Sequence, residues 1–410
     1  MSDQPRSPRR ILLADADAFF VAVARMVDPD GAGKAPLLIV GGAAGSRGVV
    51  CSASYETRKF GVRSAMPISR ALRLCPDALC VPVPRRACGV KHREIRAVLD
   101  RFTPAVQAAS IDEWYLDLGG TERLHGGASL EEIAHRIRAE VNAATGLSVS
   151  LGGGTSKLVA KLAVERAKPK PGTGANGVHV VAPGAELDFM RQLALVDIPG
   201  IGPKSAARLA DVGLRTVEDV LALDDAGLAR LVGARDAVWL AERVLGIDAG
   251  EVAEREVAKS ISRDETFDTD VHDDVLLEGE LAELVGRAAA ELRSDALTAR
   301  TVTVRIRDTD FTTRQASRTV DEALESDRAL LGVARPLLAK LRRGRRVPAR
   351  LLGVALSNFT PPPTVQLGLF EGTRAPLETP KDRELARAMD TVRARFGRDA
   401  IAPGRKPRTP

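Results

Sequence analysis

Short apolar runs that end at acidic or glycine residues recur through the first 170 positions. Ile11–Ala14 is entirely apolar and stops at Asp15, which predicts a buried strand with a carboxylate at its end. Similar runs predict strands at residues 37–40, 48–53 and 147–151, and apolar residues at helical spacing predict a helix at residues 130–144. This part of the chain therefore mixes strands and helices around acidic strand ends.

The pattern changes after this region. Residues 168–177 are rich in Pro and Gly and predict a loop or hinge, residues 187–245 predict short helices, and the charged residues 247–257 predict a linker. From Lys259 onward we expect a third unit. Its predicted elements are a helix at residues 274–294 and strands at residues 301–307, 312–320 and 350–357.

The last 50 residues contain eight of the 24 prolines, which predicts a mostly extended tail with one helix at residues 383–396. Within this tail, Leu369 and Phe370 are large apolar side chains with little to cover them. Burial in a partner's pocket would stabilise such side chains by about 1.5 to 3 kcal/mol each. The alternative is that the segment folds back on the third unit.

Composition narrows the class of protein. The chain has 410 residues, of which 44% are hydrophobic and 28% charged, so it can bury several cores and is neither disordered throughout nor collagenous. The net charge of +6 permits a polyanionic partner without requiring one.

The spacing of the cysteines and the hydropathy pattern indicate the cellular compartment in which the protein functions. The four cysteines form no Cys-X-X-Cys pair and the five histidines do not bracket them at zinc spacing, which predicts reduced thiols. Asp15 and Asp17 interrupt the apolar stretch that follows the N-terminal arginines, so no signal peptide is predicted. No other run approaches the ~18 apolar residues of a membrane helix. We expect a soluble, cytoplasmic protein that does not bind a membrane.

Acidic residues at two strand ends are the first candidate site. Asp15 and the pair Asp112-Glu113 follow apolar stretches far apart in the sequence. Adjacent antiparallel strands would bring these carboxylates together, where they would repel one another without cations. Two Mg²⁺ ions would relieve that repulsion and suit in-line phosphoryl transfer. The alternative is that they are ordinary acids at strand ends, and spacing alone does not separate the two.

Several motifs in one order resemble a known family. They are residues 15–20 (Asp-Ala-Asp-Ala-Phe-Phe), 53–61 (Ala-Ser-Tyr-Glu-Thr-Arg-Lys-Phe-Gly), 110–117 (Ser-Ile-Asp-Glu-Trp-Tyr-Leu-Asp), 154–161 (Gly-Thr-Ser-Lys-Leu-Val-Ala-Lys) and 259–261 (Lys-Ser-Ile). Together they resemble the signature set of Y-family DNA polymerases of the DNA polymerase IV (DinB) class. The resemblance runs in order from about residue 10 to residue 370.

The resemblance implies an α+β multidomain, right-hand polymerase with palm, fingers, a helical thumb and an α/β little-finger domain. The expected boundaries are residues 1–18 and 84–172 for the palm, 19–83 for the fingers, 173–246 for the thumb with a helix-hairpin-helix turn, 247–258 for a linker, 259–360 for the little finger and 361–410 for a flexible tail.

The resemblance also implies a catalytic centre. Asp15, Asp112 and Glu113 would bind two Mg²⁺ ions, with Mn²⁺ as a substitute, and Ala16 would add its backbone carbonyl. Asp17 matches a motif acid that is either structural or functional.

The substrate-binding residues implied by the resemblance are Tyr55, Arg58 and Lys157 for the incoming triphosphate and Phe20 for the steric gate against a 2′-hydroxyl. Lys59 and Lys161 would contribute only to the electrostatic field. Without the resemblance, Tyr55 and Arg58 would be read as a surface pair and Phe20 as core packing. Three residues depart from the family pattern, and they are Ala18, Trp114 and Ser156.

DNA contacts are expected in two regions. Gly200, Gly202 and Lys204 belong to a hairpin turn whose backbone amides can approach a phosphate. The basic run at residues 328–350 and four arginines on predicted strands would bind the duplex irrespective of its sequence, and these are Arg305, Arg307, Arg314 and Arg318. The alternative for these cations is a solvated surface.

The implied activity is template-directed, low-fidelity DNA synthesis across damaged template. The expected partners are primer-template DNA, deoxynucleoside triphosphates and a sliding clamp, the last bound through Gln366, Leu369 and Phe370. We expect a monomer associated with the nucleoid. The alternatives are a non-catalytic DNA-binding scaffold and a nucleotidyl cyclase, and a primer-extension assay with Mg²⁺ separates all three.

Overall fold

The computed structural model describes residues 8–169, 174–254, 258–361, 376–397 and 400–401. Contacts divide the chain into two compact units, residues 1–255 and 256–410. None of the helices in these described ranges is both long enough and apolar enough to span a bilayer.

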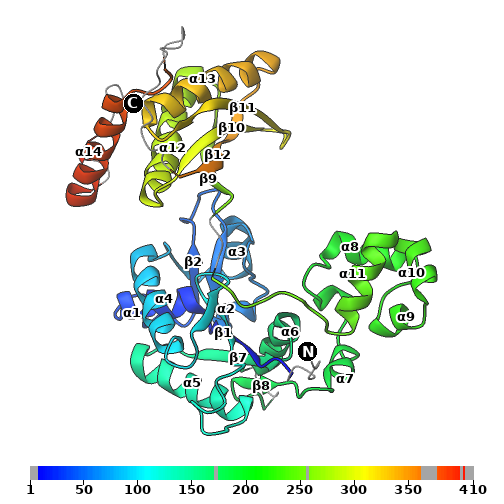
Figure 1. Ribbon diagram of the computed structural model, residues 1–410. Coiled ribbons are helices and arrows are strands. Elements are labelled where there is room, and N and C mark those ends of the chain that lie inside the picture. Colours follow the sequence, from blue (N-terminus) through cyan, green and yellow to red (C-terminus); the bar gives the residue numbers. More distant parts are fainter. Residues whose placement is uncertain (1–7, 170–173, 255–257, 362–375, 398–399, 402–410) are drawn as a thin grey trace, which may run out of the picture. The chain divides into compact units, whose positions relative to one another are not determined.

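A five-stranded sheet, the palm sheet, forms the centre of the first unit (Figure 1). Its strands lie in the order β5-β6-β1-β7-β8, with β1 antiparallel to both β6 and β7. The bounds are Ile11–Ala16 for β1, Ala105–Ala108 for β5, Glu113–Asp117 for β6, Val149–Gly154 for β7 and Val178–Val180 for β8. All six residues of β1 are buried, as the apolar run predicted for its first four.

Helices cover both faces of this sheet. On one face α4 (Arg85–Leu99) and α5 (Leu130–Thr145) pack against alternate β1 residues such as Leu12 and Ala14. On the other face α6 (Lys157–Ala167) packs against Ile11 and Leu13. A side chain at Gly152 would lie 2.1 Å from the Val164 backbone nitrogen, so the glycine allows α6 to approach β7 closely.

The fingers region follows β1. Helix α1 (Phe19–Val27) leads to a three-stranded sheet of order β3-β2-β4, with two short helices. The bounds are Leu38–Gly41 for β2, Val50–Ala53 for β3, Tyr55–Arg58 for α2, Ile68–Leu74 for α3 and Leu79–Val81 for β4. Its small core is formed by residues such as Ile39, Val50 and Ile68.

The helical segment predicted at residues 187–245 consists of α7 (Glu186–Met190), a 3₁₀ turn (Leu195–Asp197), α8 (Pro203–Asp211), α9 (Val217–Leu221), α10 (Asp225–Val232) and α11 (Ala234–Val244). These helices share a core with Leu158 and Val159 of α6. The segment is therefore packed onto the palm at α6.

The second unit contains a four-stranded sheet of order β11-β10-β12-β9 (Figure 1). The bounds of its strands are Ser260–Val271 for β9, Thr298–Asp308 for β10, Thr313–Leu324 for β11 and Ala349–Thr360 for β12. Two helices accompany the sheet, α12 (Asp274–Ser294) and α13 (Asp327–Gly344). Helices α12 and α13 pack on the face that contains Val302, Val304 and Ile306, as the alternation predicted. The long edge strand β9 was not predicted.

The C-terminal helix α14 (Pro380–Phe396) corrects one expectation. The helix was predicted at residues 383–396, but within a flexible tail. Instead, Asp390 forms a two-pronged ion pair with Arg293 of α12, and Glu378 accepts hydrogen bonds from the backbone N–H groups of Glu325 and Ser326. Polar contacts fix this helix to the second unit, and a search for apolar periodicity does not detect them.

Candidate active site

Two carboxylates meet on neighbouring strands of the palm sheet. The register of β1 and β6 places Asp15 directly opposite Glu113, at the ends of both strands. Only 7% of Asp15 is exposed. Burial and the neighbouring Glu113 charge raise the pKa of Asp15 to about 7, although Lys168 opposes this shift. Burial therefore makes the charged form of Asp15 costly even with a lysine beside it.

Two lysines provide the positive charge at this pair. The Lys168 ammonium lies 2.9 Å from Asp15 Oδ2, and Lys161 forms an ion pair with Glu113. Burial on its own lowers the pKa of Lys168, but the charges of Asp15 and Glu165 raise it overall. Lys161 thus contacts a carboxylate directly, and its contribution to the electrostatic field at the triphosphate stays a prediction. Lys168 was missed because it lies in the Pro- and Gly-rich stretch read as a hinge.

The third predicted ligand, Asp112, adjoins the pair through its backbone. Its carbonyl accepts a hydrogen bond from the Ala16 N–H at 2.9 Å. Its side chain is half-buried and accepts a hydrogen bond from the Ser110 hydroxyl. Across the described ranges, no three His, Cys, Asp or Glu side chains converge closely enough to hold a metal ion. The structure thus brings two of the three carboxylates together.

Asp17 has a different environment from Asp15. Its two carboxylate oxygens each accept a hydrogen bond at 2.8 Å, from the hydroxyls of Ser148 and Ser150. These bonds join the turn after β1 to the start of β7, which supports the structural alternative for Asp17.

The chain turns sharply between Asp17 and α1. Ala18 has the left-handed conformation, with φ of 46°, and α1 begins at Phe19 without a capping side chain. The first N–H groups of a helix have no partner within the helix and attract anions. The small side chain of Ala18 suits this turn, because bulky or β-branched residues are strained there.

Phe20 and the two predicted triphosphate residues lie beyond this turn. Phe20 is half-buried and packs edge-on against Phe19, with 5.7 Å between ring centroids. Tyr55 is 43% exposed, and the Arg58 guanidinium lies 5.0 Å from its ring centroid. Burial raises the pKa of Tyr55, and the charges of Asp17, Arg58, Lys168 and Asp15 also act on it, so it lies within electrostatic reach of the carboxylates.

Lys157 points elsewhere. Its ammonium donates to Gln107 Oε1 at 2.6 Å and to the Glu251 carbonyl at 3.3 Å, and lies 4.8 Å from the Tyr115 ring centroid. The predicted triphosphate lysine is therefore not among the lysines that reach the carboxylate pair. The family motif pointed to Lys157, the first residue of α6. In the structure, Lys161 and Lys168 are the lysines that contact Glu113 and Asp15.

The predicted hairpin turn lies before α8. Gly200 has φ of +100°, and a side chain there would lie 2.7 Å from the Trp239 ring, so only glycine fits. Gly202 precedes α8, whose first turn has no side-chain cap and contains the exposed Lys204. Backbone N–H groups are thus available at this turn.

The arginines of the second unit separate into two groups. Arg305 and Arg307 alternate with the buried residues of β10 and lie on the face away from the helices. Arg314 lies on the helix side and forms a two-pronged ion pair with Asp308, which is fully buried. This contact corrects the DNA-binding assignment of Arg314. Arg318 is exposed on β11, on the helix side.

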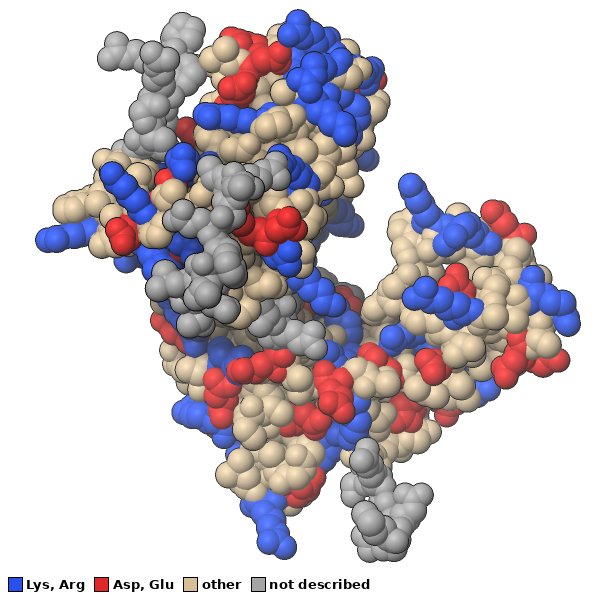
Figure 2. Space-filling model, turned by 45° about the horizontal axis from the view of Figure 1, so that its top comes forward, with Lys and Arg blue, Asp and Glu red and all other residues tan. Residues whose placement is uncertain are grey.

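Acidic partners also occupy part of the basic run at residues 328–350. Arg328 pairs with Asp382, Arg342 with Asp274, and Arg345 with Asp308 and Asp310. Figure 2 shows Lys and Arg side chains gathered along one edge of the uppermost part of the view, with acidic side chains beside them. Ion pairs therefore account for part of the run. The clamp-binding residues predicted at Gln366, Leu369 and Phe370 lie outside the described residues.

Three family models match the chain. The impB/mucB/samB family matches residues 14–165, its C-terminal domain matches residues 258–369, and a SAM-like helix-hairpin-helix tandem matches residues 193–238. The first two matches together span more than half of the chain.

Curated relatives match almost from end to end. A protein named DNA polymerase IV from Dehalococcoides mccartyi (strain CBDB1) is 36% identical over 399 residues, covering 97% of this chain and 98% of the relative. A protein of the same name from Caulobacter vibrioides (strain ATCC 19089 / CIP 103742 / CB 15) is 35% identical, covering 95% of this chain and 92% of the relative.

Solved structures agree with these matches. A Y-family DNA polymerase chimera has a TM-score of 0.76 and 26% identity, covering 86% of this chain and all of the other. An insertion ternary complex of Dbh DNA polymerase has a TM-score of 0.59 over the same coverage.

Proposed function

Because this chain belongs to the Y family of DNA polymerases, in its DNA polymerase IV group, we propose that its template-directed DNA synthesis takes place at the Asp15–Glu113 pair. The protein is a translesion DNA polymerase that depends on divalent metal. The observation that carries the location is the strand register, which brings two carboxylates side by side at the ends of neighbouring strands. Their only close cations among the described residues are two lysines.

This donor set fits two Mg²⁺ ions, with Mn²⁺ as a substitute. Carboxylate and carbonyl oxygens are the ligands that Mg²⁺ prefers, and the strand register brings two carboxylates together at this site. Asp15, Glu113, Asp112 and the Ala16 carbonyl would hold the ions. When bound, the metal supplies electrostatic stabilisation of the attacking and leaving oxygens during in-line phosphoryl transfer.

Asp112 reaches this site by a rotation of its side chain. Its backbone is already fixed by the hydrogen bond to Ala16, so exchange of the Ser110 hydroxyl for another partner requires no change of the strand pairing. Ser110 therefore holds the third carboxylate aside in the state described.

The incoming triphosphate would lie between α1 and α6. The uncapped N-terminus of α1 offers backbone N–H groups to phosphate oxygens. Arg58 contributes planar donors, Tyr55 a hydroxyl group, and Lys168 and Lys161 contribute charge that carboxylates hold close to the site. Phe20, just inside the first turn of α1, would exclude a 2′-hydroxyl.

The duplex would contact two further surfaces. The turn at Gly200–Gly202, with Lys204, would bind a backbone phosphate. Arg305 and Arg307 on one face of the second unit's sheet, and Arg318 on the edge strand β11, would add sequence-independent contacts. The segment with Gln366, Leu369 and Phe370 would bind a sliding clamp, with the polymerase acting as a monomer at the nucleoid. Removal of Leu369 and Phe370 should abolish stimulation by a clamp and leave synthesis without a clamp unchanged.

Primer extension with and without divalent metal tests the proposal. We expect deoxynucleotide addition with Mg²⁺, weaker selectivity with Mn²⁺ and no addition after chelation. The same reaction is analysed for cyclic nucleotide, which a nucleotidyl cyclase would release. DNA binding without extension under every metal condition would identify a non-catalytic scaffold and overturn the proposal.

A further inference from the structure

The segment that follows α11 lies along the palm. The Ser156 hydroxyl donates a hydrogen bond to the Gly246 carbonyl at 2.8 Å, at the start of this segment. Residues 247–254 then cross the palm within the first unit. We call residues 247–254 the docked linker.

Two basic side chains hold the middle of the docked linker through its backbone. Arg9 donates to the Gly250 carbonyl at 2.9 Å and to the Asp248 carbonyl at 3.5 Å. Lys157 donates to the Glu251 carbonyl at 3.3 Å. Because the acceptors are backbone carbonyls, these contacts fix the path of the chain whatever the linker side chains are.

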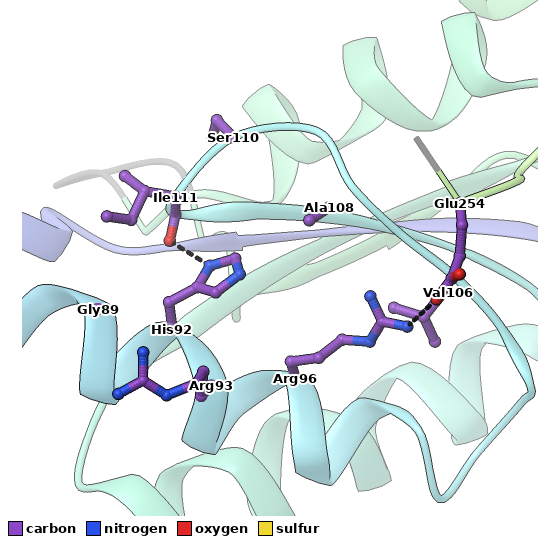
Figure 3. A pocket seen from close by; sticks show the side chains of 9 residues that line it. All are labelled: Gly89, His92, Arg93, Arg96, Val106, Ala108, Ser110, Ile111 and Glu254. Carbon is purple, nitrogen blue, oxygen red and sulfur yellow. Dashed lines mark hydrogen bonds and ion pairs between the residues drawn. The ribbon is translucent and has the colours of Figure 1, made fainter. Parts of the chain in front are cut away.

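An apolar contact and an ion pair complete the attachment. Val252 packs against the core formed by Ile11, Leu13 and α6. Glu254 lies 3.6 Å from Arg96, at a cavity of about 500 Å³ between α4 and β5 (Figure 3). The linker is thus anchored from Asp248 to Glu254, its last described residue.

The same cavity borders the loop that carries Asp112. Ser110 and Ile111 line it, and the Ile111 carbonyl lies 2.9 Å from His92 Nδ1 (Figure 3). The end of the docked linker and the loop that carries Asp112 therefore line the same cavity.

We propose that Arg9, Lys157 and Arg96 form a binding site for the interdomain linker, which we call the seat. A seated linker shortens the length of chain that connects the palm to the little finger, and so strengthens binding of primer-template DNA. The proposal rests on the polymerase activity of the family, but not on the assigned metal ligands or the clamp segment. In it, Lys157 is a positioning residue and not a triphosphate ligand.

Chain length gives the expected size of the effect. With the linker seated, six residue steps separate Glu254 from Ser260, which can span at most about 20 Å. If the linker leaves the seat, fourteen steps separate Gly246 from Ser260, which can span about 50 Å. The effective concentration of a tethered domain falls roughly as the −3/2 power of tether length, which corresponds here to about a threefold to fourfold loss of DNA affinity.

The first experiment removes the seat. We expect Arg9→Gln with Arg96→Gln to speed amide hydrogen exchange in residues 247–254 and to weaken primer-template binding about threefold, measured by fluorescence anisotropy. The slope of log affinity against log salt should stay unchanged, because no phosphate contact is lost. Arg93→Gln is the matched control, since Arg93 lines the same cavity but forms no hydrogen bond or ion pair with the described linker residues. Unchanged exchange, or a slope reduced by about one unit per arginine, would overturn the proposal.

Lys157→Met distinguishes positioning from nucleotide binding. A positioning role predicts faster linker exchange and weaker DNA binding, with the KM for deoxynucleotide unchanged within about twofold at saturating DNA. A KM increase of more than tenfold with unchanged exchange would make Lys157 a triphosphate ligand and contradict the seat. Absence of metal-dependent activity in the unmodified protein would instead contradict the proposed function. Failure of the seat proposal and failure of the proposed function are therefore distinguishable.

A tether insertion tests the mechanism without disturbing the seat. Nine Gly and Ser residues inserted between Glu254 and Ser260 should weaken DNA binding about fourfold while linker exchange remains native. Unchanged affinity after the insertion would show that tether length does not matter and would overturn the proposal.

Discussion

The palm carboxylates and the little-finger arginines were both predicted as functional clusters, and the structure treats them differently. Asp15 and Glu113 lie opposite each other because two short strands pair in register. Arg314, by contrast, faces the helices and neutralises the buried Asp308, whereas Arg307 on the neighbouring strand faces away from them. A strand end determines where a carboxylate lies. A long basic side chain is directed by the acids that surround it.

Replacement of Asp15 should produce the largest effect. We expect Asp15→Asn to lower nucleotide incorporation by at least about 10³-fold, because several kcal/mol of metal-based stabilisation is lost. The same change should raise the thermal stability of the metal-free protein, since it removes a buried charge. Stopped-flow incorporation and thermal unfolding in chelator measure the two effects. Lower stability in chelator would show that the Lys168 ion pair outweighs the burial of Asp15.

Phe20 tests whether the substrate pocket adjoins this pair. We expect Phe20→Ala to reduce the preference for deoxynucleotides over ribonucleotides by about 10²-fold, because a ring beneath the sugar would no longer exclude a 2′-hydroxyl. The ratio of kcat/KM for a deoxynucleotide to kcat/KM for its ribonucleotide measures this preference. Phe19→Leu is the control, since Phe19 is buried in the palm core. An unchanged ratio in Phe20→Ala would make Phe20 a packing residue.

Arg314 and Arg307 form a matched pair within the second unit. Arg314→Met should lower the free energy of unfolding by about 2 kcal/mol, because Asp308 would keep only Arg345 as a charged partner. Arg307→Met should leave stability unchanged and reduce the salt slope of DNA binding by about one unit. Chemical denaturation and anisotropy titrations measure these quantities. The reverse result would return Arg314 to the DNA interface.

The pH dependence of stability gives the smallest effect. In the metal-free protein the pKa of Asp15 is raised to about 7 from 3.8. Between about pH 4 and pH 7 the folded state therefore binds more protons than the unfolded state, so this residue's contribution to stability declines as the pH rises through that window. Divalent metal should remove this decline, as should Asp15→Asn. Denaturation midpoints measured across the window, with and without metal, provide the check.

Much of this organisation follows from local sequence. The apolar run before Asp15 predicted β1, and the alternation in β10 predicted its buried face. Strand β9 was missed because its charged residues, such as Arg263 and Glu265, pair with α12 and conceal the alternation. The packing of α14 and the contact of Lys168 with Asp15 depend on partners distant in sequence, which no periodicity records.

The rate of single-nucleotide incorporation in Glu113→Gln and Asp17→Asn, measured side by side, tests the central claim most directly. Both changes neutralise a carboxylate near the end of β1, but Asp17 is held by two serine hydroxyls and Glu113 faces Asp15. We predict a loss of at least about 10³-fold for Glu113→Gln and less than about tenfold for Asp17→Asn, with primer-template affinity retained in both. Near-native incorporation by Glu113→Gln, or equal losses in the two variants, would contradict the assignment of catalysis to the Asp15–Glu113 pair.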